Sequence, residues 1–223
     1  FGLKSGWFNW CLNMAQRYFT LLDRCISEID HCIHTLSAHD KVPKDDFPPP
    51  AALPDGQRKQ VASMMRVNHA GEICAQALYR GQALTSRDPA IKSLLRHAAS
   101  EEEIHLGWCQ QRLQELDSHT SKLAPVWYGM SYMMGTAIGK TSNGFSMGFV
   151  AETERQVVIH LDQHLKNLPK SDAKSTAILQ RMRQDENQHS TMALRSGGRR
   201  LPRPARSLMR ATSRIMIKTA AIF

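Results

Sequence analysis

The sequence is poor in the features that define several common protein classes. It has only five cysteines in 223 residues, and no two of them form a CxxC pair. An odd number of cysteines without such pairs indicates neither a disulfide framework nor a zinc ribbon, so reduced thiols in an intracellular compartment are expected. These cysteines are Cys11, Cys25, Cys32, Cys74 and Cys109. No secretory signal is recognised, and Met14 is expected as a natural start.

Long apolar runs and strand patterns are also scarce. One uncharged stretch, residues 123–139, approaches the ~20 residues that a membrane-spanning helix needs, but it contains Gly, Ser, Tyr and Thr. We therefore expect a buried or interfacial helix there. No hairpin pattern indicates a β-sheet, and no GxGxxG motif after a strand indicates a nucleotide-binding site. With 42% hydrophobic residues, the chain is long enough to form one compact domain.

Acidic residues are absent after Glu186. The chain has a net charge of +9, and eight positive charges lie in this last part, so the remainder is close to neutral. A basic end indicates a polyanionic partner, either nucleic acid or an anionic membrane surface. The eight residues are Arg195, Arg199, Arg200, Arg203, Arg206, Arg210, Arg214 and Lys218.

The spacing within this basic end favours a membrane. Apolar and small residues recur at helical spacing on one face, and basic residues run along another, which is typical of an interfacial helix. The apolar face comprises Leu208, Thr212, Ile215, Thr219 and Ile222. The alternative is that this face packs on the body of the protein. Nucleic-acid binding is not expected, because no aromatic residues lie between the arginines.

Helical periodicity and breaker residues divide the whole chain into helices. These are predicted at about residues 7–38, 56–84, 89–117, 125–140, 145–168 and 172–197, with a turn at 141–144 and a last basic helix after Pro204. Residues 1–55 form an N-terminal helix and a proline-rich linker, and residues 56–223 form the main domain. Long helices with short connections predict an all-α antiparallel bundle.

Two ExxH motifs carry the candidate chemistry. They occur at residues 102–105 and 186–189, and the helix before each motif carries a further glutamate. Residues three apart on a helix share a face, so each Glu–His pair can point to one place. The order E, ExxH, E, ExxH is that of a ferritin-like di-iron carboxylate bundle. The candidate ligands are Glu72, Glu102, His105, Glu154, Glu186 and His189. Four carboxylates and two imidazoles favour two divalent ions, iron first and manganese next.

Other polar residues near these motifs have competing interpretations. The acidic run of residues 101–103 is typical of a solvated face, and only Glu102 has a histidine three residues later. Glu152 competes with Glu154, but Leu161 lies one heptad after Glu154 and indicates that Glu154 points inward. Asp185 is expected to hydrogen-bond a ligand histidine.

The pair His160 and His164 has the HxxxH spacing that some zinc sites use. We prefer for His160 the role of a polar neighbour of the metal centre.

Four stretches resemble the demethoxyubiquinone hydroxylase family, in particular its bacterial branch. They are residues 65–72, 101–105, 149–154 and 185–189. The resemblance extends from about residue 61 to the C-terminus and is looser over the first 55 residues. It implies that the six candidate ligands hold two iron ions and that His160 lies near the second site.

The resemblance also implies the reaction and its setting. The family's enzymes are peripheral membrane monooxygenases that hydroxylate the ring of a polyprenyl methoxy-methyl-benzoquinol with O2, before the last O-methylation of ubiquinone biosynthesis. The expected electron source is NADH or the reduced quinone. The expected surroundings are an anionic membrane surface on the cytoplasmic face of the bacterial inner membrane, with lipid-binding or biosynthetic complex partners.

The residues alone leave two other functions open. A ferritin-like iron-storage or peroxide-scavenging protein shares the six-ligand arrangement. A metal-free helical scaffold would instead use the N-terminal helix and the basic tail to bind partners.

A soft apolar stretch around residues 127–149 suggests a path for the quinone between this segment and the basic tail. The GxxxG spacing of Gly135 and Gly139 predicts close contact with another helix.

Overall fold

The computed structural model describes residues 20–37 and 46–222. The chain forms two compact units, Phe1–Thr35 and Leu36–Phe223. In the first unit, helix α2 spans Leu21–Leu36. Thr20 and Asp23 hydrogen-bond each other reciprocally at its start, as in a capping box. Met14, the part of the predicted N-terminal helix before Thr20 and much of the predicted linker lie outside the described residues.

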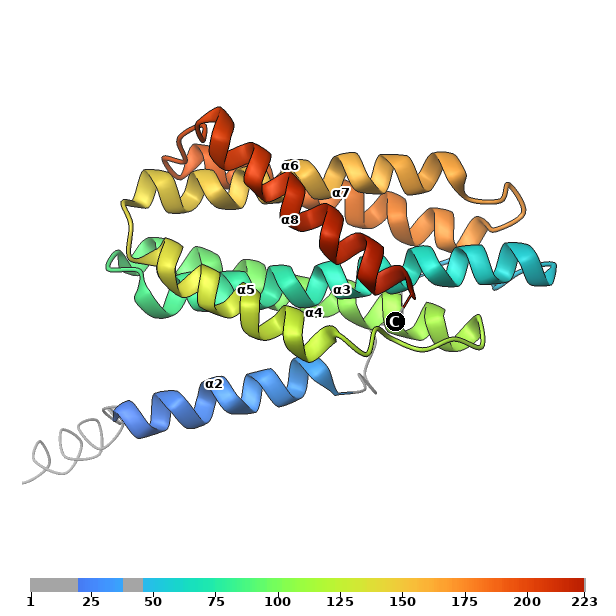
Figure 1. The fold of residues 1–223 in the computed structure, drawn as a ribbon, viewed down its shortest axis with the longest axis horizontal. Helices are drawn as coiled ribbons and strands as arrows, with labels where there is room; N and C mark the ends of the chain where they lie inside the picture. Colours follow the sequence, from blue (N-terminus) through green and yellow to red (C-terminus); the bar gives the residue numbers. More distant parts are fainter. Residues whose placement is uncertain (1–19, 38–45, 223) are drawn as a thin grey trace, which may run out of the picture. The chain divides into compact units, whose positions relative to one another are not determined.

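The described residues of the second unit form only helices and the turns and loops that join them, which confirms the all-α prediction (Figure 1). Its helices are α3 (Asp55–Thr85), α4 (Pro89–Glu115), α5 (Ala124–Gly139), α6 (Asn143–Asn167), α7 (Ala173–Arg195) and α8 (Arg203–Ile222). Asp88 accepts a hydrogen bond from the Ala90 amide and caps α4, directly before a proline in the first turn. The predicted turn at residues 141–144 is shorter than expected, because Ser142 caps α6 and the helix already begins at Asn143.

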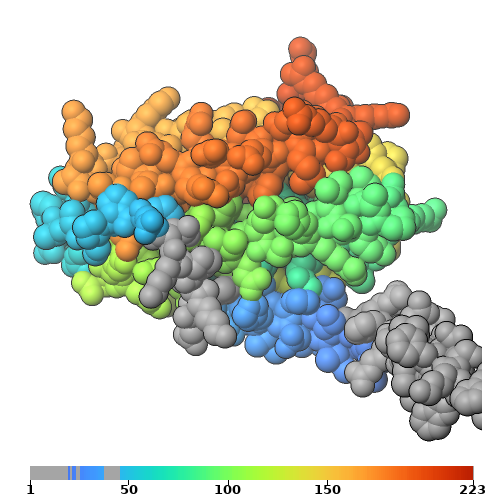
Figure 2. Space-filling view, turned by 180° about the vertical axis from the view of Figure 1, so that it is seen from behind, coloured from blue at the N-terminus to red at the C-terminus, as the bar shows by residue number. Residues whose placement is uncertain are grey.

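Four of these helices form the core of the bundle. α3 packs against α4, and α6 packs against α7, while α5 lies along α3 and α8 crosses both α3 and α6 (Figure 1). On the opposite face, α7 lies alongside α4 (Figure 2). The helices α5 and α8 therefore cover one side of the bundle and leave the other to α4 and α7.

Two apolar clusters fill the ends of this core. On each core helix, a residue of each cluster is spaced one heptad from the predicted glutamate ligand. On each core helix, the residues seven before and seven after the candidate glutamate are buried apolar side chains. One end contains Tyr79, Leu95, Met147 and Ala193, and the other contains Met65, Cys109, Leu161 and Leu179. Since residues one heptad apart share a helix face, all four glutamates point into the layer between the two clusters.

The close contact predicted from the GxxxG spacing is confirmed between α5 and α3. A Cβ atom at Gly135 would overlap the carbonyl group of Leu78, and one at Gly139 would overlap the carbonyl of Gln82. On the α3 side, Gly81 meets the carbonyl of Tyr132 in the same way. The two backbones therefore touch, and the opposite face of α5 is left exposed.

None of the described helices is both long and apolar enough to cross a membrane. Helix α5 buries Trp127 and Tyr128 and exposes four large apolar side chains. These are Val126, Met130, Met133 and Met134. One face of this helix is therefore buried and the other exposed, and its interfacial location stays a prediction.

Helix α8 packs with a different face from the one considered at the sequence level. Its contacts with α3 are made by Met216, Ile217 and Ala220. The stripe Leu208, Ile215 and Ile222 is exposed, with 70%, 58% and 71% of the side chains accessible. Packing of this stripe on the body is therefore wrong, because the neighbouring face that carries Met216, Ile217 and Ala220 makes the contact.

Candidate metal centre

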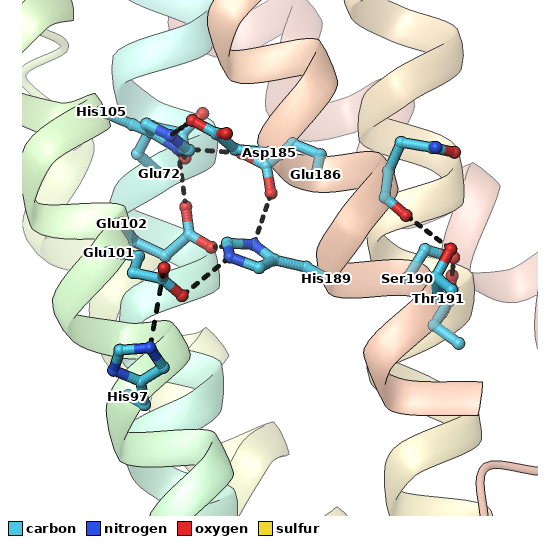
Figure 3. Close-up of polar contacts among 12 residues, drawn as sticks. Glu72, His97, Glu101, Glu102, His105, Asp185, Glu186, His189, Ser190 and Thr191 are labelled. Atoms are coloured by element: carbon cyan, nitrogen blue, oxygen red, sulfur yellow. Dashed lines mark hydrogen bonds and ion pairs between the residues drawn. The ribbon is translucent and has the colours of Figure 1, made fainter. Parts of the chain in front are cut away.

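The six predicted ligands meet inside the bundle, one or two from each core helix. Glu72 comes from α3, the first ExxH motif from α4, Glu154 from α6, and the second ExxH motif from α7. All six are buried, and His189 is the most exposed of them at 6%. Figure 3 shows five of the six turned toward one another across the space between the helices. The convergence expected from the motif order is therefore present.

The six residues form two overlapping groups that could each hold a metal ion. One group contains Glu72, Glu102, His105 and Glu186, and the other contains Glu102, Glu154, Glu186 and His189. In each group, one ligand atom from every member lies within 4.8 Å of the others. Glu102 and Glu186 belong to both groups, so their two oxygens can bridge a pair of ions.

The two histidines present the same nitrogen to these shared carboxylates. Nδ1 of His105 lies 2.9 Å from Oε1 of Glu186 and 3.3 Å from Oε2 of Glu102. Nδ1 of His189 lies 3.0 Å from Oε2 of Glu186 and 3.3 Å from Oε1 of Glu102. Each carboxylate thus turns one oxygen toward each histidine, so Glu102 and Glu186 would be the two residues that contact both ions if a pair were bound.

The other ring nitrogens face acidic residues of the opposite motif (Figure 3). Nε2 of His105 lies 3.3 Å from Oδ2 of Asp185, and Nε2 of His189 lies 3.0 Å from Oε2 of Glu101. A proton held on Nε2 and donated to these acids leaves Nδ1 with its lone pair for a metal. Each ExxH helix therefore orients the histidine of the other.

Glu101 is the site residue that sequence reasoning missed, because an acidic run suggested a solvated face. A signal was present in the repetition of the motif: an acid precedes the glutamate in both Glu101–Glu102 and Asp185–Glu186. Each of the two acids also contacts a residue outside the centre. Oε1 of Glu101 lies 3.7 Å from His97, and Oδ2 of Asp185 accepts a hydrogen bond from Arg181 at 3.0 Å.

Burial shifts the pKa values of the carboxyl groups in two directions. Burial raises the pKa of Glu72 and Glu154 well above its usual value, and nearby carboxylates raise it further. Burial also raises the pKa of Glu102, but hydrogen bonds from His105 and His189 outweigh it and hold that pKa below its usual value. Without a cation, the centre therefore keeps protons on some of its carboxylates.

The histidines show the complementary effect. Burial alone lowers the pKa of His105, but hydrogen bonds to Asp185, Glu102 and Glu186 raise it well above the usual value. The same balance raises the pKa of His189 to about 12. Both rings therefore hold a second proton where a metal ion would otherwise supply the positive charge.

The donor set and its unsatisfied atoms fit divalent cations. Both carboxylate oxygens of Glu154 are buried without a hydrogen-bond partner among the described residues. A buried carboxylate in this state is costly unless it is protonated or coordinates a metal. Carboxylate oxygens with imidazole nitrogens suit iron or manganese. By contrast, Glu152 accepts hydrogen bonds from Arg155 and Gln156, so it does not compete for the site.

His160 and His164 pack against each other, with ring centroids 4.0 Å apart. Burial lowers the pKa of His160 to about 4 and that of His164 to about 3, so both rings are neutral at pH 7. Among the described residues, the groups that could hold a metal do not include this pair. In the described part of the chain, no hydrogen bond links His160 to the six ligands, and its place beside the centre stays a prediction.

Comparison with known proteins identifies the relatives of this chain. The sequence model of the family described as "Ubiquinone biosynthesis protein COQ7" matches residues 59–220. A 3-demethoxyubiquinol 3-hydroxylase of Stutzerimonas stutzeri is 46% identical over 208 residues, which cover 92% of this chain and 97% of that protein. The protein of the same name from Nitrosococcus oceani is 45% identical over 211 residues, 93% of this chain and 99% of that protein. These alignments extend into the first 55 residues, where only a loose resemblance was expected.

Proposed function

The chain belongs to the COQ7 family of ubiquinone biosynthesis proteins, and on this premise we propose that it is a di-iron monooxygenase acting on demethoxyubiquinol. It adds one hydroxyl group to the ring of a polyprenyl methoxy-methyl-benzoquinol with O2, before the final O-methylation. The observation that carries this proposal is the pair of four-residue groups sharing Glu102 and Glu186. The ferritin-like bundle of the family supplies one glutamate or one ExxH motif from each core helix, as this chain does.

Iron is the metal that we propose for both positions. A bound iron pair supplies the activation of O2 that hydroxylation of an aromatic ring requires. Four carboxylates offset the charge of two divalent ions, so the loaded centre is close to neutral inside the apolar bundle. The two electrons come from NADH or from the quinol itself, and the chain has no GxGxxG motif that would favour a nucleotide site of its own.

The residues around the centre hold its geometry and keep it dry. Glu101 and Asp185 fix the two histidine rings, so that Nδ1 faces the metals. The apolar clusters on either side, which contain Tyr79 and Met65 respectively, exclude water from the layer of ligands. Exclusion of water strengthens the electrostatic interactions there and protects a reactive oxidant from side reactions.

A peripheral membrane location follows from the lipid nature of the substrate, and the surface of the bundle supports it. The exposed methionines of α5 and the exposed stripe of α8 belong to the two helices that cover one side of the bundle. The basic residues of α8 lie beside that stripe and suit an anionic membrane surface. This side would contact the cytoplasmic face of the bacterial inner membrane. The quinone would enter from this side, and lipid-binding partners would bind to it.

The decisive test is an assay of quinones extracted from cells that lack this protein. The demethoxy precursor should accumulate, and the wild-type gene should restore ubiquinone. Glu186→Ala should fail to do so, because it removes a ligand shared by both metal groups. Glu152→Ala on α6 is the matched control and should restore ubiquinone. Normal ubiquinone levels in the deletion strain would refute the assignment.

The two other functions considered at the sequence level are separated from this one by physical measurements. An iron-storage protein would form large cages that accumulate iron far beyond the two positions formed here. A scaffold would bind less than one iron per chain and would tolerate Glu102→Ala. Family membership and the shared ligand groups favour the hydroxylase over both.

A further inference from the structure

Asn68 is a buried polar side chain that the metal centre leaves unused. It precedes Glu72 on α3 by four residues, so the two lie on one helix face about 6 Å apart along the axis. Asn68 and Glu72 are equally buried, each with 3% of its surface accessible. The amide group therefore belongs to the interior of the bundle, one turn from the ligands.

Neither amide atom of Asn68 has a hydrogen-bond partner within the described residues. Nδ2 and Oδ1 are both buried and unpaired. Glu154 is likewise unpaired at both of its terminal oxygens, and there the proposed metal explains the vacancy. Burying an amide without hydrogen bonds costs ~2–7 kcal/mol, so native proteins rarely do so without a ligand or water.

Along α3, Asn68 lies close to an apolar part of the core. Met65, one turn earlier on α3, belongs to the apolar cluster that also contains Leu161 and Met182. A quinol ring has apolar faces and two ring oxygens on opposite sides. A carboxamide offers both a donor and an acceptor, so it can hold a quinol hydroxyl or a quinone carbonyl.

We propose that Asn68 binds the substrate by hydrogen-bonding one ring oxygen of the quinol, which orients the ring toward the metal centre. This inference rests on the proposed function and adds a residue that recognises the head group. The amide distinguishes a ring that carries oxygen from the apolar chain attached to it. It also gives the ring a fixed orientation relative to Glu72 and the metals.

The test compares Asn68→Leu with wild-type protein, using the full-length, iron-loaded chain in its oxidised state. The probe is demethoxyubiquinone with a short prenyl chain, and binding is followed by quenching of tryptophan fluorescence, so no turnover is needed. The dissociation constant of the variant for the quinone should be about tenfold higher, because the loss of one hydrogen bond weakens binding by about this factor. Its thermal stability should be unchanged or higher, because leucine has a similar volume and carries no unpaired polar atoms.

Tyr79→Phe is the matched control. Tyr79 lies on α3 seven residues after Glu72, is fully buried, and has a hydroxyl group without a hydrogen-bond partner in the described structure. Removing that hydroxyl should leave quinone binding unchanged. A second probe, a prenylated benzene without the two ring oxygens, should bind wild type and Asn68→Leu equally.

Each other outcome contradicts the inference in a recognisable way. Equal quinone binding by wild type and Asn68→Leu would overturn it, and a loss of stability without weaker binding would assign the amide to a structural water. A selective loss in Tyr79→Phe would place the head group at the other end of the ligand layer. If Asn68→Leu fails to fold, Asn68→Ala is judged by the same binding ratio. A wild-type protein that binds no quinone would instead refute the proposed function.

Discussion

Glu102 and Glu186 differ from the other candidate ligands because each lies within reach of both groups. Glu72 and Glu154 each serve one group, and the histidines divide in the same way. The two kinds of glutamate therefore have different expected effects when they are replaced, although all four are buried. The distinction concerns single side chains and can be tested by counting metal ions.

We expect the wild-type chain to bind about two iron ions. Glu154→Ala should leave about one ion, because the group around Glu72 keeps its four donors, whereas Glu186→Ala should leave neither position intact. Metal analysis of purified protein after anaerobic loading measures this difference. Glu152→Ala is the control and should retain both ions. Equal metal content in Glu154→Ala and Glu186→Ala would contradict the bridging assignment.

The protons of the metal-free centre lead to a pH dependence. Glu72, Glu154, His105 and His189 have raised pKa values, so between pH 6 and 8 the folded metal-free chain holds more protons than the unfolded chain. Its stability should therefore fall as the pH rises through this range. Metal binding must displace these protons, so the affinity for Fe²⁺ should rise about tenfold per pH unit for each proton released.

Thermal unfolding of metal-free protein at pH 6 and 8 checks the first expectation. Titration calorimetry in buffers of different ionisation enthalpy counts the protons released by the metal. A metal-free chain that is more stable at pH 8 would show that these groups are not protonated in the folded state.

At the scale of the elements, the glycines of α5 allow its backbone to touch that of α3. Gly135→Ala should destabilise the fold by about 1–3 kcal/mol or more, because its Cβ would overlap the backbone of Leu78. Gly129→Ala is an internal control on the same helix, since a Cβ there meets nothing within 4 Å. It should stabilise the fold by about 0.5–1 kcal/mol, through the helix propensity of alanine.

Chemical denaturation followed by circular dichroism measures both glycine variants. If Gly135→Ala were as stable as Gly129→Ala, the two helices would not be in backbone contact. The element that carries the exposed methionines would then be free to move relative to α3.

The helical bundle of the second unit has one side covered by α5 and α8, and another formed by α4 and α7 (Figures 1 and 2). Exposed apolar side chains occur on both α5 and α8, and the basic residues of the chain are concentrated in and before α8. An interfacial enzyme needs such an asymmetry, because burial of apolar side chains and attraction to anionic lipids act together.

Ile215→Asp and Met134→Arg should each weaken binding to vesicles that contain anionic phospholipid, by about tenfold or more, because each puts a charge in place of an exposed apolar side chain that would enter the lipid. Leu194→Asp is the matched control, since Leu194 is exposed on α7, a helix outside the pair formed by α5 and α8. Vesicle sedimentation at low and high salt measures the affinity, which should fall with salt for wild type. Undiminished binding of Ile215→Asp would exclude α8 as the membrane contact.

Local sequence patterns were enough to predict the order of the helices, the Asp88 cap of α4 and the six candidate ligands. Periodicity, prolines and the E, ExxH, E, ExxH order depend on neighbours along one helix, where spacing alone decides which residues share a face. The two apolar clusters can be predicted in the same way, because on each core helix a member of each cluster lies seven residues before or seven residues after the glutamate, on the same helix face.

Contacts between different helices could be seen only in the folded chain. Glu101 on α4 contacts His189 on α7. The amide of Asn68 is unpaired because no neighbouring group among the described residues forms a hydrogen bond with it. The packing face of α8, which carries Met216, Ile217 and Ala220, was likewise settled by its contacts with α3. Such contacts join residues far apart in the chain, and side-chain size and direction decide them, so no local pattern specifies which partners meet.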